Sequence, residues 1–272
     1  MIVFPNCKIN IGLWITDRLT DGYHSLQTVM YPVPMHDILE ILLGDDKTSL
    51  YQSGIVVEGS MEQNLCYKAW LLLNRKYNIP PVQMHLHKMI PLGAGLGGGS
   101  SDAAFALRLL DNLFCLNLSR QELSEFATEL GMDCPFFIHN KPMLATSKGE
   151  VLQEIDLNLS GYYLVIVKPA LHISTAKAYS LITPHKRSIS ILNQVMEPVS
   201  QWKNFLTNDF EEALIELHPE IGTIKSNLYT QGAIYASMSG SGSAVFGLFD
   251  NKPPQVSFPH CVVFSTLLGS NP

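Results

Sequence analysis

A glycine-rich stretch followed by serines is the part of this sequence best suited to hold a phosphate group. Five of the seven residues from Gly93 to Gly99 are glycines, so this backbone can bend sharply and approach a ligand without a Cβ in the way. Helix-forming residues follow from Ala103 to Leu110. A glycine loop that opens into a helix points backbone N–H groups and the positive end of the helix dipole toward one place, which is typical of an anion site.

Three well-known phosphate loops differ from this stretch. A Walker loop needs a lysine after its last glycine, and residues 91–104 contain no lysine. The glycines at 93–98 fit the dinucleotide pattern Gly-x-Gly-x-x-Gly. However, the region about 20 residues further on holds Ser119 and Glu122, which predict a helix cap rather than the acidic end of a second strand. A protein-kinase loop has a valine two places after its last glycine, where this chain has Ser100.

The stretch Pro91–Ala104 resembles the ATP-binding motif of the GHMP kinases, which include galactokinase, homoserine kinase and mevalonate kinase. Its Gly-Gly-Gly-Ser-Ser-Asp-Ala-Ala form is most similar to that of the 4-diphosphocytidyl-2-C-methyl-D-erythritol kinases. The resemblance implies that the nucleotide also contacts Asn64 and Lys88. It implies that ATP binds to the loop residues Pro91, Gly93, Ala94, Gly95, Leu96, Gly97, Gly98, Gly99, Ser100 and Ser101.

Two catalytic residues follow from the same resemblance. Pro-Asn-Cys-Lys-Ile-Asn at 5–10 and Gly-Met-Asp-Cys-Pro at 131–135 resemble the family motifs that carry a catalytic lysine and aspartate. The implied lysine is Lys8, with Asn10 as a nearby substrate contact, and the implied aspartate is Asp133. In phosphoryl transfer an aspartate can accept the proton of the attacking hydroxyl, while an ammonium stabilises charge on that oxygen.

Substrate recognition is expected at two further segments. Asp-Gly at 21–22 predicts a turn that presents Tyr23 and His24 together. An aromatic ring stacks on a base, and an imidazole offers a donor and an acceptor to a base edge. The segment resembles the cytidine-binding part of the family, and Thr175 and Tyr179 resemble further parts of that pocket. Whether Met30, Tyr31 or Tyr179 contacts the cytosine stays open.

A second glycine- and serine-rich motif, Met238–Gly247, lies near the end of the chain. Alone, such a motif is more often a flexible turn. In this order along the chain it resembles the C-terminal motif of the family, which closes on the phosphates and the substrate. The resemblance makes Ser239 and Gly240 candidate substrate-binding residues.

Composition limits the classes of partner. The net charge of −6 argues against nucleic acid or an anionic membrane as a partner, and no apolar run approaches the roughly 20 residues that span a bilayer. Five scattered cysteines match no metal spacing and favour a reducing cytoplasm. His85 and His87 share one strand face without a third ligand, so we assign no protein metal ligand. Mg²⁺ is expected only because it accompanies ATP. We expect a monomer or a weak homodimer.

The order of predicted elements indicates an α+β protein. Strands are expected at 2–13, 26–31, 37–43, 82–87, 161–169, 245–249 and 261–264, and helices at 64–77, 103–110, 119–130, 210–217 and 219–231. Pro32 and Pro34 are expected to separate two strands. Pro135 cannot continue the preceding helix, so Asp133 is expected on a tight connection after it. We place a domain boundary at residue 158. The resemblance implies a ribosomal protein S5 domain 2-like domain at 1–158 and a ferredoxin-like domain at 159–272.

These features predict an ATP-dependent kinase of the GHMP family. The resemblance implies that the chain phosphorylates the 2-hydroxyl of 4-diphosphocytidyl-2-C-methyl-D-erythritol in the non-mevalonate isoprenoid pathway. One alternative is another GHMP small-molecule kinase such as a homoserine kinase, against which the Tyr23-His24 segment argues. The other is a nucleotide-binding protein without catalysis, against which Lys8 and Asp133 argue.

Overall fold

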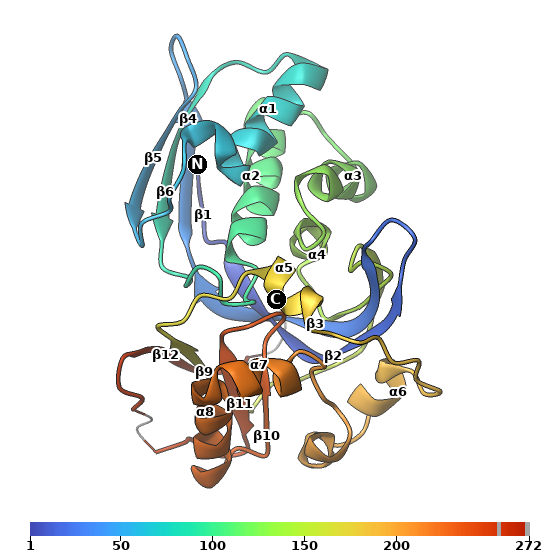
Figure 1. The fold of residues 1–272 in the computed structure, drawn as a ribbon. Coiled ribbons are helices and arrows are strands. Elements are labelled where there is room, and N and C mark those ends of the chain that lie inside the picture. Colours follow the sequence, from blue (N-terminus) through green and yellow to red (C-terminus); the bar gives the residue numbers. More distant parts are fainter. Residues whose placement is uncertain (255–256, 270–272) are drawn as a thin grey trace. The chain divides into compact units, whose positions relative to one another are not determined.

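The computed structural model describes residues 1–254 and 257–269, and within it the chain forms two compact units (Figure 1). The first unit consists of Met1–Cys7, Met35–Leu92 and Gly97–Asn140. The second consists of Lys8–Pro34, Gly93–Leu96 and the described residues from Lys141 onward. The predicted division into domains at residue 158 rests on the order of motifs along the chain, and it stays a prediction.

A four-stranded sheet forms one layer of the first unit. Its order is β1 (Ile2–Val3), β4 (Ile38–Leu43), β6 (Val82–Lys88) and β5 (Ser49–Gly54), and only β5 runs parallel to its neighbour β6. The alternation predicted for β6 is confirmed, since the side chains at 82, 84 and 86 are buried and those at 83 and 85 are exposed. The short strand β5 was not predicted.

Helices cover one face of this sheet (Figure 1). They are η1 (Met61–Gln63), α1 (Leu65–Tyr77), α2 (Gly98–Phe114), α3 (Arg120–Leu130) and α4 (Cys134–His139). Ser119 and Glu122 form the predicted capping box of α3. The predicted connection before Pro135 is confirmed, because α3 ends at Leu130 and residues 131–133 lie outside the helices. The short helix α4 was not predicted; Pro135 lies in its first turn, where a missing N–H leaves no intrahelical bond unmade.

The second unit contains two sheets. The first has the order β2 (Asn6–Arg18), β3 (His24–His36), β7 (Met143–Thr146) and β8 (Val151–Glu154). The expectation that Pro32 and Pro34 end a strand is wrong, because β3 continues through both. Strand β7 pairs only with residues 28–30 of β3, so on that side no N–H donor is needed at the prolines.

The other sheet of the second unit is antiparallel, in the order β10 (Tyr235–Met238), β11 (Val245–Phe249), β9 (Tyr163–Pro169) and β12 (Cys261–Leu267). Helix α8 (Pro219–Thr230) packs on it and against α7 (Glu211–Leu217). The shorter elements are α5 (Thr175–Ser180), α6 (Ile191–Val195) and η2 (Val199–Asn204). A buried apolar core that includes Val165, Leu228 and Phe249 joins the helices to the sheet.

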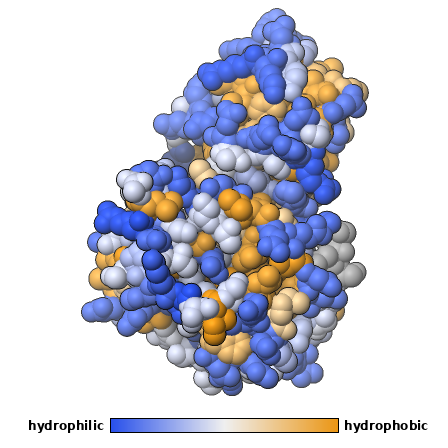
Figure 2. Space-filling view, turned by 90° about the vertical axis from the view of Figure 1, so that its right-hand side faces the viewer, coloured by the Kyte–Doolittle hydropathy of each residue, from blue (hydrophilic) through white to orange (hydrophobic). Residues whose placement is uncertain are grey.

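The surface is mixed in character. Figure 2 shows hydrophilic residues over much of one face, with hydrophobic residues gathered in smaller areas. Within the described residues, none of the helices has both the length and the apolar character required to cross a membrane.

Candidate active site

Lys8 is held by oxygen atoms from two other places in the chain. Strand β2 places its side chain in the interior, with 3% exposure. Its Nζ donates to the carbonyl oxygen of Gly95 at 3.0 Å and to the amide oxygen of Asn10. The hydroxyl of Ser239 donates to the same Gly95 oxygen at 2.8 Å and accepts the N–H of Asn10 at 3.2 Å. Three motifs that are far apart in the sequence therefore meet at one carbonyl group.

Glycine is required where these motifs touch. A Cβ on Gly95 would lie 1.9 Å from the carbonyl oxygen of Ser239, and Gly95 has a φ of +71°. Gly240 has a φ of +55°, and its Cβ would lie 3.2 Å from the Cα of Gly95. A main-chain bond from Ala244 to Ala94 joins the two segments again, at 3.2 Å. The first half of the glycine loop is thus packed directly against the C-terminal motif.

The second half of the loop opens helix α2, as predicted. Gly97 is the N-cap residue with a φ of +70°, and no side chain in the described part of the chain caps the helix there. The first intrahelical bond runs from the N–H of Ser101 to the carbonyl of Gly97. The N–H groups of Gly98, Gly99 and Ser100 precede that bond, so they are the donors that an anion at this helix end would use.

Three of the predicted ATP-binding residues have buried side chains, so only their backbone atoms could contact a nucleotide. The side chains of Ala94, Leu96 and Ser101 are 2%, 1% and 0% exposed. The hydroxyl of Ser101 has no hydrogen-bond partner among the described residues. These three residues shape the loop through packing, whereas Gly99 is exposed and Ser100 is partly exposed.

Lys88 lies in a buried ion cluster. Its side chain is 1% exposed, and its Nζ pairs with Asp37 and, at 2.7 Å, with Asp102. The other oxygen of Asp37 accepts the N–H groups of Met89 and Ile90, at 2.5 and 2.8 Å. The sequence placed Lys88 in direct contact with the nucleotide, but its charge is already engaged by two buried carboxylates. Its described contacts brace the chain just before the loop.

Burial sets the charges in this cluster. Burial alone would lower the pKa of Lys88, but Asp102 and Asp37 together raise it above its ordinary value. Burial also raises the pKa of Asp102, to about 7, against the opposing effect of Lys88. One oxygen of Asp102 has no hydrogen-bond partner among the described residues, which adds to the cost of its ionised form. Helix α2 therefore contains, near its start, a buried carboxyl group, Asp102, whose pKa is raised to about 7.

Asp133 is the N-cap residue of α4. Its backbone is helical, and its side chain makes no capping bond to that helix. Burial raises the pKa of the neighbouring Cys134 thiol to about 12, so this cysteine is no thiolate nucleophile at neutral pH. Asp133 belongs to the first unit and Lys8 to the second. Their joint role in catalysis stays a prediction.

Asn64 caps helix α1. Its side-chain oxygen accepts the N–H of Cys66 at 2.8 Å, and its amide donates to Gln52 at 3.2 Å. The side chain is partly exposed. The position has a clear structural role, and its contact with the nucleotide stays a prediction.

Two of the predicted cytidine-binding residues lie against each other. The rings of His24 and Tyr179 are stacked, with centroids 5.2 Å apart and planes at 28°. Tyr179 also meets the edge of Phe210 at 4.9 Å. Burial, and then the charge of Arg18, lowers the pKa of His24. His24 is therefore neutral at pH 7, with one donor and one acceptor nitrogen.

Tyr23 and Thr175 lie on the surface of the same unit. Tyr23 is 57% exposed, Lys148 lies 4.6 Å from its ring centroid, and Lys148 also pairs with Asp21 at 2.5 Å. The hydroxyl of Thr175 lies 3.2 Å from that of Ser241 in the C-terminal motif. The predicted turn is present, since the carboxylate of Asp21 accepts the N–H of Tyr23 at 3.1 Å.

Met30 and Tyr31 are core residues. They are 2% and 1% exposed, and the hydroxyl of Tyr31 accepts the N–H of Leu159 at 3.3 Å. Of the three candidates left open for the cytosine, only Tyr179 combines partial exposure with a stacked partner.

The described residues contain no group of three or more His, Cys, Asp or Glu side chains arranged to hold a metal ion. His85 and His87 instead flank the hydroxyl of Ser53, each at 2.9 Å. A metal brought to this protein by a nucleotide would depend on the phosphates for most of its ligands.

Sequence reasoning missed several residues that support the site. Asp37 and Asp102 engage Lys88, and Asn208 and Glu211 contact the backbone around Ser239. No local pattern pointed to Asn208, because its partners are carbonyl groups about 30 residues away. Asp102 stands inside the loop motif, so its place in the motif was a usable signal.

Comparison with known proteins agrees with these motifs. The model of the GHMP kinases N terminal domain matches residues 64–141, and that of the GHMP kinases C terminal domain matches residues 191–258. A 4-diphosphocytidyl-2-C-methyl-D-erythritol kinase of Bacteroides fragilis is 50% identical over 98% of this chain and 100% of that protein.

Solved structures show the same fold. A crystal structure of 4-(cytidine 5'-diphospho)-2C-methyl-D-erythritol kinase is 31% identical, with a TM-score of 0.78 over 91% of this chain and 90% of that one. A homoserine kinase of Cytophaga hutchinsonii shares the fold at 16% identity, with a TM-score of 0.64 over 98% of this chain and 96% of that one. The predicted two-domain GHMP kinase fold with mixed helices and strands is confirmed. The chain belongs to the GHMP kinases, and within them to the family of the 4-diphosphocytidyl-2-C-methyl-D-erythritol kinases.

Proposed function

We propose that this chain transfers the γ-phosphoryl group of ATP to the 2-hydroxyl of 4-diphosphocytidyl-2-C-methyl-D-erythritol, a step of non-mevalonate isoprenoid synthesis. The observation that carries the proposal is the meeting of the Lys8, Gly95 and Ser239 motifs at one carbonyl group. This meeting occurs in a chain half identical, over nearly its whole length, to a kinase of that name.

The reaction assigns a role to each half of the glycine loop. The N–H groups of Gly98, Gly99 and Ser100 hold phosphate oxygens, and Gly93–Leu96 positions the loop against Lys8. The 2-hydroxyl oxygen attacks the γ-phosphorus, the bond from that phosphorus to the β-phosphate oxygen breaks, and ADP leaves. Asn64 contacts the nucleotide on its adenine side, and Lys88 acts indirectly by bracing the chain before the loop.

Proton transfer and charge stabilisation belong to two residues. Asp133 orients the 2-hydroxyl and accepts its proton, and Lys8 stabilises the negative charge that develops on the attacking oxygen. Asn10, Ser239 and Gly240 contact the substrate beside Lys8. The position of two of them supports this role. Asn10 accepts from Lys8 and donates its N–H to Ser239. Ser239 in turn donates to the Gly95 carbonyl that Lys8 also contacts.

The cytidine end of the substrate is assigned to the aromatic pair. Tyr179 stacks on the cytosine, the neutral His24 bonds its edge, and Tyr23 and Thr175 complete the pocket. Mg²⁺ bound with ATP would neutralise phosphate charge, and we assign no protein ligand to it. We assign the reaction to the cytoplasm, a reducing compartment in which the five cysteines would stay as free thiols.

The position of the new phosphate tests the proposal. The C2 carbon carries no hydrogen, so a phosphate on its oxygen gives a proton-coupled ³¹P signal that is a singlet. Phosphate on the primary hydroxyl gives a triplet, and on the secondary hydroxyl a doublet. After reaction of the purified protein with Mg-ATP and the cytidine substrate, we expect the singlet. A doublet or triplet would move the transfer to another hydroxyl.

A further inference from the structure

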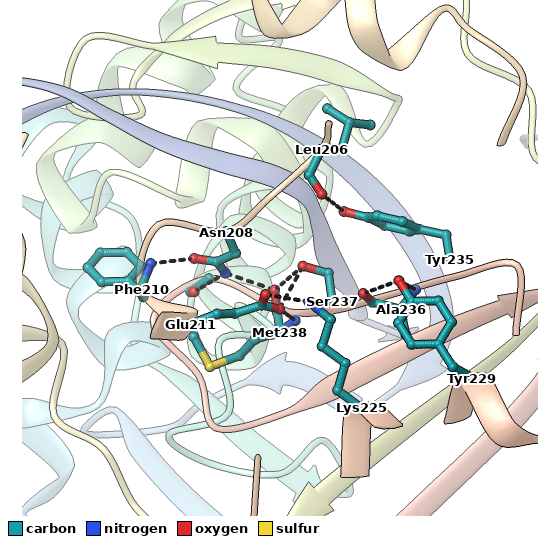
Figure 3. A network of polar contacts seen from close by, with 11 residues as sticks. Leu206, Asn208, Phe210, Glu211, Lys225, Tyr229, Tyr235, Ala236, Ser237 and Met238 are labelled. Carbon is teal, nitrogen blue, oxygen red and sulfur yellow. Dashed lines mark hydrogen bonds and ion pairs between the residues drawn. The ribbon is translucent and has the colours of Figure 1, made fainter. Parts of the chain in front are cut away.

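Asn208 holds the backbone of the C-terminal motif from within the second unit (Figure 3). Its side chain is 2% exposed, and its amide nitrogen donates to the carbonyl groups of Met238 and Gly240, both at 2.8 Å. Its amide oxygen accepts the N–H of Phe210 at 3.0 Å. One buried amide thus bridges the two carbonyls on either side of Ser239.

Glu211 holds the preceding residues from the same short segment. One oxygen accepts the N–H of Met238 at 2.6 Å and the hydroxyl of Ser237 at 3.0 Å. The other oxygen pairs with Lys225 at 2.5 Å. Because the Glu211 side chain is only 9% exposed, this ion pair compensates the charge of a buried carboxylate. Asn208 and Glu211 together engage the main chain from Met238 to Gly240 (Figure 3).

The segment is also bonded to strand β2, which carries Lys8 and Asn10. The N–H of Asp209 donates to the carbonyl of Leu13, and the Asp209 carboxylate accepts the N–H of Ile15, both at 2.8 Å. The N–H of Leu13 in turn donates to the carbonyl of Thr207 at 2.9 Å. Residues 207–211 are therefore bonded both to the strand of Lys8 and to the motif of Ser239.

We propose that Asn208 and Glu211 are positioning residues for phosphoryl transfer, which act by setting the main chain of Met238–Gly240 against the Gly95 carbonyl that Lys8 contacts. The inference rests on the proposed function. The hydroxyl of Ser239 lies between Asn10 and the Gly95 carbonyl, so a shift of this backbone moves the oxygen partners of Lys8. A displacement of about 1 Å near reacting groups lowers rates by about 100-fold.

Tyr229 of helix α8 provides a matched control, because its hydroxyl contacts strand β10, to which Met238 belongs. Its hydroxyl accepts the N–H of Ala236 at 3.1 Å and donates to the Ala236 carbonyl at 3.2 Å. Tyr229→Phe removes hydrogen bonds to β10 without touching the main chain from Met238 to Gly240. This variant therefore measures how far a loss of stability in this sheet lowers kcat when the main chain of the motif is unchanged.

Asn208→Asp is the main test. It keeps the size of the side chain and the acceptor for Phe210, but it replaces the donor with an oxygen that faces two carbonyl oxygens. We expect kcat to fall by about 100-fold, while Tyr229→Phe stays within about twofold of wild type at a comparable loss of Tm. Wild-type kcat in Asn208→Asp, or equal losses of kcat in both variants, would overturn the proposal.

A second pair covers the case in which Asn208→Asp does not fold. Glu211→Gln keeps an oxygen that accepts the Met238 N–H, whereas Glu211→Leu does not. We expect kcat of Glu211→Gln within about fivefold of wild type and a loss of about 100-fold in Glu211→Leu. Equal kcat values in the two variants would overturn the role assigned to Glu211.

Hydrogen exchange separates this inference from the function it rests on. The amides of Ser239, Gly242 and Ala244 donate within or beside the motif. We expect them to exchange at least about tenfold faster in Asn208→Asp and unchanged in Tyr229→Phe. Unchanged exchange in both variants would overturn the proposal. If the exchange pattern appears but wild type does not phosphorylate the cytidine substrate, the proposed function fails, whereas the finding that Asn208 fixes the backbone of the C-terminal motif stands.

Discussion

The side chain of Lys8 is held in one position by hydrogen bonds, which suits the role in charge stabilisation that we propose for it. Its stem is buried in β2, and its Nζ bonds to the Gly95 carbonyl and the Asn10 amide oxygen. An ammonium that is fixed before the reaction needs little reorganisation when charge develops on a nearby oxygen. The defined position of the Lys8 ammonium supports the role at the attacking oxygen that we propose for it from the family resemblance.

Asp133→Asn tests the assigned proton acceptor. The amide has nearly the same shape but cannot take a proton, so we expect kcat to fall by about 100- to 10,000-fold, with ATP affinity within about twofold of wild type. Steady-state kinetics and ATP titration measure the two quantities. Asp45→Asn, an exposed aspartate of the same unit, is the control. Near-wild-type turnover in Asp133→Asn would remove Asp133 from this role.

His24→Ala tests the cytidine pocket. Loss of the imidazole removes a bond to the base and the ring that stacks on Tyr179. Because such a stack contributes about 1 kcal/mol, we expect KM for the cytidine substrate to rise about fivefold or more, with KM for ATP unchanged. His85→Ala, on an exposed strand position, should change neither. Equal increases for both substrates would place His24 elsewhere.

Asp102→Asn tests the buried cluster under α2. Burial raises the pKa of Asp102 to about 7, so between about pH 4 and pH 7 the folded protein holds a proton that the unfolded chain releases. The free energy of unfolding therefore falls as the pH rises through this window. In Asp102→Asn this decrease should be smaller, by at most about 4 kcal/mol.

Urea unfolding at a series of pH values measures the effect of Asp102→Asn. Asp45→Asn, at an exposed carboxylate, should keep the wild-type pH dependence. An unchanged pH dependence in Asp102→Asn would mean that Lys88 keeps Asp102 ionised throughout this range.

At the scale of elements, the helix caps serve both the fold and the site. Asn64 ends the connection before α1 and satisfies the N–H of Cys66. Gly97 leaves the first turn of α2 without a side-chain cap, which reserves those N–H groups for a ligand. The two neighbouring helices thus begin in opposite ways, and only α2 begins in a way that suits an anion.

Asn64→Asp separates the cap from the proposed nucleotide contact. Aspartate caps a helix as well as asparagine does, so Tm should not fall. A new negative charge near ATP should raise KM for ATP about fivefold, as expected for about 1 kcal/mol of repulsion. Asn64→Ala is the contrast, because loss of the cap costs about 1 kcal/mol of stability. Unchanged KM for ATP in Asn64→Asp would leave Asn64 with the cap alone.

The elements that the sequence predicted correctly carry their signals locally. The capping residues Ser119 and Glu122 predict the start of α3, and the apolar alternation of residues 82–87 predicts β6. Strands β5, β7 and β10 were missed because their pairing depends on partners elsewhere in the chain, which no local pattern in these segments reveals. The continuation of β3 through Pro32 and Pro34 depends likewise on which residues its neighbour pairs with.

The site divides in the same way. The Lys8, Gly95 and Ser239 motifs could be chosen from the sequence because each resembles a known motif, and the structure brings them together. The environment of Lys88 could not be predicted, since its partner Asp37 lies 51 residues away. The role of Asn208 could not be predicted either, because it donates to main-chain carbonyl groups, which every residue has.

At the scale of the whole molecule, the chain is a kinase whose expected acceptor is linked to cytidine. The similarity to kinases of that substrate runs along nearly the whole chain, whereas the homoserine kinase shares the fold at 16% identity. The fold is thus shared by kinases with different acceptors, and we propose that the segments with Tyr23, His24 and Tyr179 determine the choice of acceptor.

Release of ADP by the purified protein tests the expected acceptor most directly. Mg-ATP is supplied with 4-diphosphocytidyl-2-C-methyl-D-erythritol, homoserine or mevalonate in parallel reactions. We predict turnover with the cytidine substrate alone. Turnover with homoserine or mevalonate in its place, or none with any acceptor while ATP still binds, would contradict the account.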